Sequence, residues 1–161
     1  HKIRFGVIAV GHTFMTITTY GFDFILYPYV IWLVGFFIGF PFLTLLAALI
    51  DIVTVYVYDR TKKDWLGIEA IKSVEESISG GFVSKVLNWT RNRGDVTTAS
   101  ALAFFVDPLI IMLYMRNGSN QYNWFSVRDW KIFLTATIVG NLYWAILVLL
   151  GVESASYLMT G

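Results

Sequence analysis

The residues with the greatest potential for chemistry are a few ionisable or amide side chains that stand alone within long apolar stretches. They are His12, Asp23, Asp51, Asp107 and Asn141. A charged side chain at the centre of a bilayer costs about 2.5–3.5 kcal/mol even on insertion scales, so such residues pair with one another or line transport paths. We therefore interpret these five side chains as candidates for an ion or proton path, with hydrogen bonding between helices as the structural alternative.

Each candidate shares a helix face with small or hydroxyl side chains at about 100° per residue. On the first apolar stretch, for example, Asp23 lines up with Thr16 and Thr19. The other faces carry Phe, Leu, Ile and Val, which suit lipid. The pattern therefore predicts that the polar stripes face the interior of a helical bundle.

Depth along the expected helices separates the candidates. His12, Asp107 and Asn141 fall near the middle of the bilayer, Asp23 near its outer edge and Asp51 near its inner edge, at about 1.5 Å of rise per residue. His12 and Asp107 reach similar heights, and each is the most plausible ionisable partner of the other. We therefore expect these two side chains to be neighbours in the bundle interior.

Several sharper chemistries find no support. The chain has no cysteine and a net charge of +1, which argues against a thiolate site and against a basic surface for nucleic acid. It has no glycine-rich phosphate loop and no dense set of zinc ligands. No nucleophile and base stand at a recognisable spacing. We predict no catalytic residue, metal or cofactor, and we favour a protein that is not an enzyme.

The elements that must position these residues are membrane helices. Hydrophobic residues make up 57% of the 161 positions and charged residues 14%, against about 25% charged in a typical soluble domain. We therefore expect one all-α integral membrane domain, a small bundle of four transmembrane helices with the lipid bilayer as its surroundings. The expected spans are residues 3–26, 30–56, 97–115 and 132–152, with a tight turn near Tyr27-Pro28-Tyr29 because proline disfavours helix there.

Lys and Arg in the loops predict the orientation. We expect the protein in the cell (inner or plasma) membrane, with its N-terminus on the cytoplasmic side. In this orientation nine of the 12 basic residues lie on the cytoplasmic side, and both termini are cytoplasmic. An alternative makes residues 97–115 a re-entrant hairpin broken at Asp107-Pro108. All basic residues then lie on the cytoplasmic side, and the C-terminus lies outside.

The loop at 59–96 predicts amphipathic cytoplasmic helices. Asp64 can cap a helix that begins at Trp65, and apolar residues then recur at three- and four-residue steps, which forms one stripe. The stripe consists of Trp65, Ile68, Ile71, Val74 and Ile78. It would dock on a partner, lie on the inner membrane interface or pack on the ends of the spans. Gly35 and Gly39 form a GxxxG motif that permits close helix approach, which fits a homo-oligomer or a larger membrane complex.

Three functions remain open on these grounds. The first is translocation of a small ion or proton past the inward-facing ionisable residues. The second is a non-catalytic scaffold or assembly protein that binds partners through the stripe and the GxxxG face. The third is a lipid-active membrane enzyme that uses interfacial carboxylates near Arg60, Lys62 and Lys63.

Overall fold

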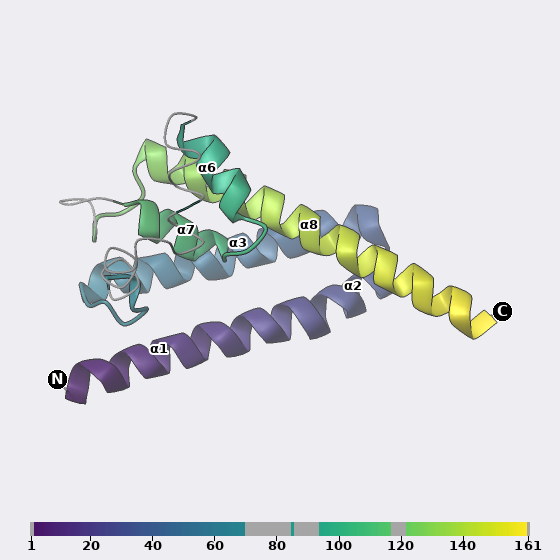
Figure 1. Cartoon of the computed structure of the whole chain (residues 1–161), viewed down its shortest axis with the longest axis horizontal. Helices are drawn as coiled ribbons and strands as arrows, with labels where there is room; N and C mark the ends of the chain where they lie inside the picture. The colour runs from purple at the N-terminus through teal and green to yellow at the C-terminus, as the bar shows by residue number, and fades with distance from the viewer. Residues whose placement is uncertain (1, 70–84, 86–93, 117–121, 161) are drawn as a thin grey trace.

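The computed structural model describes residues 2–69, 85, 94–116 and 122–160, and within them the side chains of all but residues 2–10, 12 and 152–160. Every regular element in these residues is helical, as expected (Figure 1). Three of the helices are long and apolar enough to cross a membrane. The elements in chain order are α1 (Lys2–Gly21), η1 (Phe22–Leu26), α2 (Tyr27–Val34), α3 (Phe36–Thr61), α6 (Asp95–Leu102), α7 (Pro108–Met115) and α8 (Val127–Thr160).

The first turn of the chain lies at Gly35, and the prediction of a turn at Tyr27-Pro28-Tyr29 is wrong. Helical dihedral angles continue through η1, a π-helical segment in which the amide of Tyr27 donates to the carbonyl of Phe22. The π-helical turn is wider than an α-helical turn and comes directly before Pro28. It therefore lets the helix continue past Pro28, which has no amide hydrogen to donate. Gly35 then adopts φ 77° and ψ 168°, a conformation that glycine adopts without steric cost.

The GxxxG motif serves this turn within one chain. A Cβ atom on Gly39 would lie 2.9 Å from Cδ1 of Ile31, so the glycine permits α2 to fold back closely on α3. Gly35 itself is the turn residue between the two helices. The motif therefore has a role inside the chain, and its expected role between copies of the chain stays a prediction.

The prediction that residues 97–115 form one span is not confirmed. The segment contains two short helices, α6 and α7, joined by a link over residues 103–107. Beyond α7, Arg116 forms an ion pair of 2.8 Å with Asp59, and the ring of Trp124 lies 6.1 Å from that of Tyr56. Because Asp59 and Tyr56 stand near the end of α3, the segment from α6 to α7 returns to the end from which it started.

Helix α8 begins with a capping arrangement. The amide of Asp129 donates to Oγ of Ser126 at 3.1 Å, and the amide of Ser126 donates to Oδ2 of Asp129 at 3.0 Å. This reciprocal pair satisfies donors that a helix start would leave unbonded. The helix then runs for 34 residues to Thr160, and this end lies opposite the start of α1 along the molecule (Figure 1).

Two hydrophobic cores hold the bundle together. The larger core joins the end of α3, both short helices and the start of α8. The smaller core consists of Tyr27, Ile31, Leu43 and Ala145, from α2, α3 and α8. Helices α2, α3 and α8 pack closely on one another, whereas α1 has its main contacts with η1. The space between the two cores and α1 is where the candidate site lies.

The predicted helix at Trp65 begins three residues later than expected. The carboxylate of Asp64 accepts hydrogen bonds from the amides of Ile68 at 2.7 Å and Glu69 at 2.9 Å. Asp64 therefore binds amides at a helix start, but the predicted N-cap is not observed, because the helix starts at Ile68, four residues after Asp64. Ile68 and Trp65 pack in or against the larger core, which favours packing on the protein's own helices for these two residues. The predicted stripe residues Ile71, Val74 and Ile78 lie outside the described residues.

Candidate functional site

A cavity of about 360 Å³ lies between the two hydrophobic cores. On α3 it begins beyond Leu43 of the smaller core and ends at Thr54, next to Val55 of the larger core. On α8 it occupies the corresponding stretch around Gly140. The end of α1, the segment η1 and the link between α6 and α7 complete its walls. The cavity is thus framed by four separate parts of the chain.

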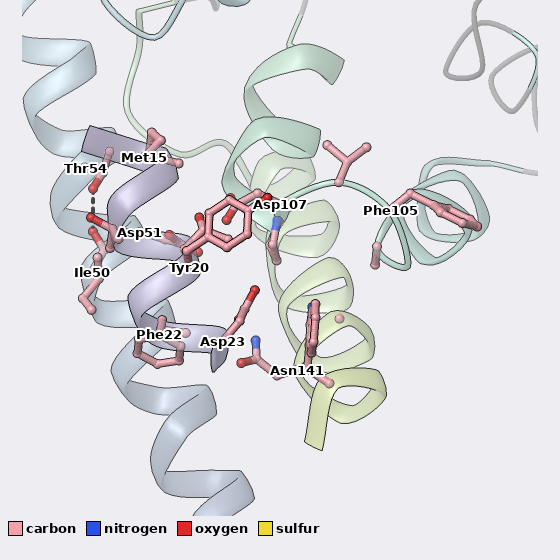
Figure 2. A pocket seen from close by; sticks show the side chains of 18 of the residues that line it. Met15, Tyr20, Phe22, Asp23, Ile50, Asp51, Thr54, Phe105, Asp107 and Asn141 are labelled. Atoms are coloured by element: carbon pink, nitrogen blue, oxygen red, sulfur yellow. Dashed lines mark hydrogen bonds between the residues drawn. The ribbon is translucent and has the colours of Figure 1, made fainter. Parts of the chain in front are cut away.

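Four of the five predicted path residues line this cavity. They come from different elements: η1, α3, the start of α7 and α8. Figure 2 shows them around the same space: Asp23, Asp51, Asp107 and Asn141. The three carboxyl groups are half-buried, and all three line the same cavity. The structure therefore brings together side chains that are up to 118 positions apart in the sequence.

The backbone around Asp107 explains its position. Asp107 is the N-cap of α7, with ψ 135°, and its Oδ1 accepts a hydrogen bond of 2.9 Å from the amide of Leu109. Pro108 follows at the first helical position, where a missing amide hydrogen costs nothing. The Asp-Pro pair is thus a helix start rather than a kink in a span. One side of the carboxylate is held by the backbone, while the residue lines the cavity.

Asn141 anchors the opposite wall. The hydroxyl of Tyr27 donates to Oδ1 of Asn141, and Nδ2 of Asn141 donates to the carbonyl of Thr137 at 2.7 Å. The amide is therefore fixed by its own helix and by α2. Nearby, a Cβ atom on Gly140 would lie 3.2 Å from the carbonyl oxygen of Ala103. The absence of a side chain at Gly140 lets the link between α6 and α7 approach α8 closely.

Aromatic side chains form much of the remaining wall. Tyr20 stacks on Phe24 at a centroid distance of 5.5 Å, and Phe24 meets Trp144 of α8 edge-on at 5.6 Å. Phe104 and Phe105, from the link between α6 and α7, line the other side. Phe24 is 59% exposed and Phe105 is 70% exposed. The aromatic residues therefore form a rim that reaches the outside of the molecule.

The position of the turn changes the expected depth of Asp23. With the turn at Gly35, the first candidate span runs from Thr13 to Val34, and Asp23 falls about halfway along it. Its depth in a membrane stays a prediction. The side chain of His12 lies outside the described side chains, so its pairing with Asp107 stays a prediction.

Sequence reasoning missed a buried charge cluster at one end of the bundle. Arg116 is fully buried and lies between two carboxylates, 2.8 Å from Asp59 and 3.3 Å from Asp129. Its guanidinium carbon is 5.6 Å from the ring centroid of Phe125. The signal was present, because Arg116 directly follows an apolar run and Asp129 stands three residues after Ser126. Only the fold reveals that Asp59 joins them.

A second arginine holds the two ends of the α6–α7 hairpin. Arg128 donates to both carboxylate oxygens of Asp95 at 2.7 and 2.9 Å, and to the carbonyl of Met115 at 3.1 Å. Asp95 begins α6 and Met115 ends α7. The hydrogen bonds from Arg128 lower the pKa of Asp95 below its usual value. This hairpin is thus tied at its base to the first turn of α8.

Comparison with family models, curated proteins and solved structures finds no match to this chain. Within the described residues, no group of three or more His, Asp or Glu side chains is arranged to hold one metal ion.

Proposed function

We propose that this protein is an integral membrane protein that moves a proton or a small cation through the cavity between its two cores. The observation that carries this proposal is the convergence of three carboxyl groups and one carboxamide, from four elements, on one space. A carboxylate can take up a proton or hold a cation and release it again. Intramembrane acids are expensive to maintain and typically mark such paths.

The distribution of charge supports three crossings with the N-terminus in the cytoplasm. Helices α1, α3 and α8 alternate in direction along the molecule (Figure 1). With a hairpin over α6 and α7, all 12 basic residues fall in segments that begin and end at one end of the bundle. Positively charged loops favour the cytoplasmic side. We therefore propose that the start of α1 is cytoplasmic and the end of α8 is outside, as the re-entrant alternative predicted.

The location of the link between α6 and α7 supports a path at membrane depth. Non-helical backbone is tolerated inside a bilayer where protein shields it or where it lines a cavity. The link lines the cavity along residues 103–107. Asp51 and Asn141 fall in the middle part of their candidate spans. A re-entrant hairpin that ends near the middle of the bilayer would place Asp107 at the same depth.

The two alternative functions draw less support. A lipid-active enzyme would need free carboxylates near Arg60, Lys62 and Lys63, but Asp59 is paired with Arg116 and Asp64 caps a helix. A scaffold would need the predicted stripe, and most of that stripe lies outside the described residues. Association with a second copy or a larger complex stays a prediction.

Flux into proteoliposomes tests the proposal. The protein is reconstituted with an internal pH-sensitive dye when a pH gradient is imposed, and with an internal sodium-sensitive dye when a sodium gradient is imposed. We expect Asp51→Asn and Asp107→Asn each to reduce flux toward the level of empty vesicles. Asparagine is as good an N-cap as aspartate, so Asp107→Asn keeps the start of α7.

Asp95→Asn is the matched control, because it removes a carboxylate that lies outside the cavity. Its flux should equal that of the unmodified protein. Unchanged flux in folded Asp51→Asn and Asp107→Asn proteins would contradict the proposal, as would an equal loss in Asp95→Asn.

A further inference from the structure

The cavity has two chemically distinct parts. Its carboxyl groups are half-buried, whereas its aromatic residues Tyr20, Phe24 and Phe105 are 60%, 59% and 70% exposed. A ligand that fills the space would meet negative charge inside and aromatic surface at the rim. Such a ligand would need a cationic part and an apolar part.

The size of the cavity exceeds what a proton or a bare metal ion occupies. Its 360 Å³ corresponds to about twelve times the ~30 Å³ that one water molecule occupies in the liquid. This volume lies in the range of about 300–1,000 Å³ that is typical of small-molecule pockets. The carboxyl groups stand around the space rather than converging on one point, since no three of the described acids or histidines form a metal cluster.

The sign of the charge restricts the ligand further. Of the described residues that line the cavity, none is Lys, Arg or His. Within this described lining, an anionic ligand such as a fatty acid or a phosphate group would therefore meet three aspartates and no compensating cation. Faces of Trp, Tyr and Phe rings attract cations, and aromatic cages recognise quaternary ammonium groups. Trp144 and Phe104 supply such rings in the lining of the same cavity.

Building on the proposed function, we propose that the cavity binds an amphipathic organic ammonium ion. The ammonium group lies among Asp51, Asp107 and Trp144, and the apolar part lies against Phe24 and Phe105 at the rim. The rings of Phe24 and Phe105 are themselves part of the exposed apolar surface of the bundle, where an amphipathic molecule concentrates in a membrane. Protons compete with the ammonium ion for the same carboxylates.

Binding of benzyltrimethylammonium to the full-length protein in mild detergent tests this inference. The probe carries a permanent charge, and its carbon isostere neopentylbenzene has the same shape without the charge. Isothermal titration calorimetry should give saturable binding of the cation and at least tenfold weaker binding of the isostere. Equal binding of the two compounds would overturn the inference, because the carboxylates would then contribute nothing.

Variants locate the site. Asp107→Asn should weaken binding of benzyltrimethylammonium about tenfold, and Trp144→Leu should weaken it several-fold, in line with cation–π contributions at desolvated sites. Asp95→Asn and Trp124→Leu are the matched controls, since both residues lie outside the cavity. Unchanged affinity in Asp107→Asn and Trp144→Leu would overturn the inference.

The outcomes separate this inference from the proposed function. Proton or sodium flux through Asp51 and Asp107 without binding of benzyltrimethylammonium would refute the ligand class and leave translocation standing. Specific binding without any flux, including flux of the probe itself, would support the site and refute translocation.

Discussion

Replacing Arg116 should be among the most destabilising changes in this protein. The side chain is completely buried, and its partners Asp59 and Asp129 are only 8% and 4% exposed. In Arg116→Met the apolar part of the side chain is kept, but two carboxylates remain buried without a cation. Removing one partner of a buried ion pair costs about 3–5 kcal/mol, because the remaining charge is not compensated. We expect a loss of this size in the free energy of unfolding.

The matched control is Arg128→Gln. Arg128 also binds a carboxylate, but the two side chains are 44% and 41% exposed. Exposed pairs contribute about 0.2–1 kcal/mol, so the control should lose at most about 1 kcal/mol in the same measurement. The assay is reversible unfolding of the purified protein in mixed detergent and SDS micelles, followed by tryptophan fluorescence. Equal losses in Arg116→Met and Arg128→Gln would refute the reasoning.

A triple variant provides a second check on the same cluster. Arg116→Met combined with Asp59→Asn and Asp129→Asn removes all three charges, and asparagine retains hydrogen-bonding capacity at both acidic positions. Because no uncompensated charge is left, the triple variant should be more stable than Arg116→Met alone. A triple variant that is no more stable than the single one would mean that lost packing, rather than charge, causes the damage.

Three further predictions concern the hairpin and the topology. Gly140→Leu should lower the free energy of unfolding by about 1–3 kcal/mol through overpacking, because its Cβ would lie 3.2 Å from the carbonyl oxygen of Ala103. In Gly151→Leu no atom lies within 4 Å of the new Cβ, so this control should be near neutral in the same unfolding assay. The lowered pKa of Asp95 means that its carboxylate stabilises the folded protein at pH values above the unfolded pKa of about 3.9. This stabilisation is lost as the pH falls through the lower pKa of the folded state. Asp95→Asn should therefore reduce the dependence of stability on pH in the acid range by at most about 1 kcal/mol. Because this sequence contains no cysteine, single cysteines can report the topology. Cysteines that replace Lys63 and Val127 should react with a membrane-impermeant maleimide from the cytoplasmic side, and one that replaces Thr160 should react from outside. Labelling at position 127 from outside would instead support the four-span topology.

Composition and helical periodicity were sufficient to predict the helical class and most of the candidate site. Asp23, Asp51, Asp107 and Asn141 were selected because polar side chains in apolar helices must face inward, and the same physical requirement places them around one cavity. That Asp64 binds backbone amides at a helix start was predictable in part, because a cap depends on residues within one turn, whereas the start at Ile68 was not. The inward position of the four polar residues follows from local sequence, whereas their role in a path for protons or cations stays a prediction.

The turn and the charge cluster could not be predicted in the same way. Pro28 is a strong helix breaker in isolation, but the π-helical segment before it absorbs the missing hydrogen bond, and the turn moves to Gly35. Arg116 and Asp59 are 57 positions apart, so their pairing depends on the fold of the hairpin between them. Both errors arise where an alternative local geometry or a long-range contact decides the outcome.

The path of α6 and α7 depends on a local sequence signal and on a long-range contact. An Asp-Pro pair inside an apolar run is compatible with a kinked span and with a helix start, and local reasoning does not distinguish them. The ion pair between Arg116 and Asp59 does, because it requires the chain to return to the end of α3. Among the described residues, the same return brings Arg116 and Arg128 to the end of the bundle where Arg60 lies, and the charge rule favours such clustering on one side of a membrane. It also places Asp107 opposite Asp51 and Asn141 in the cavity, so the contact that determines the topology also completes the candidate site.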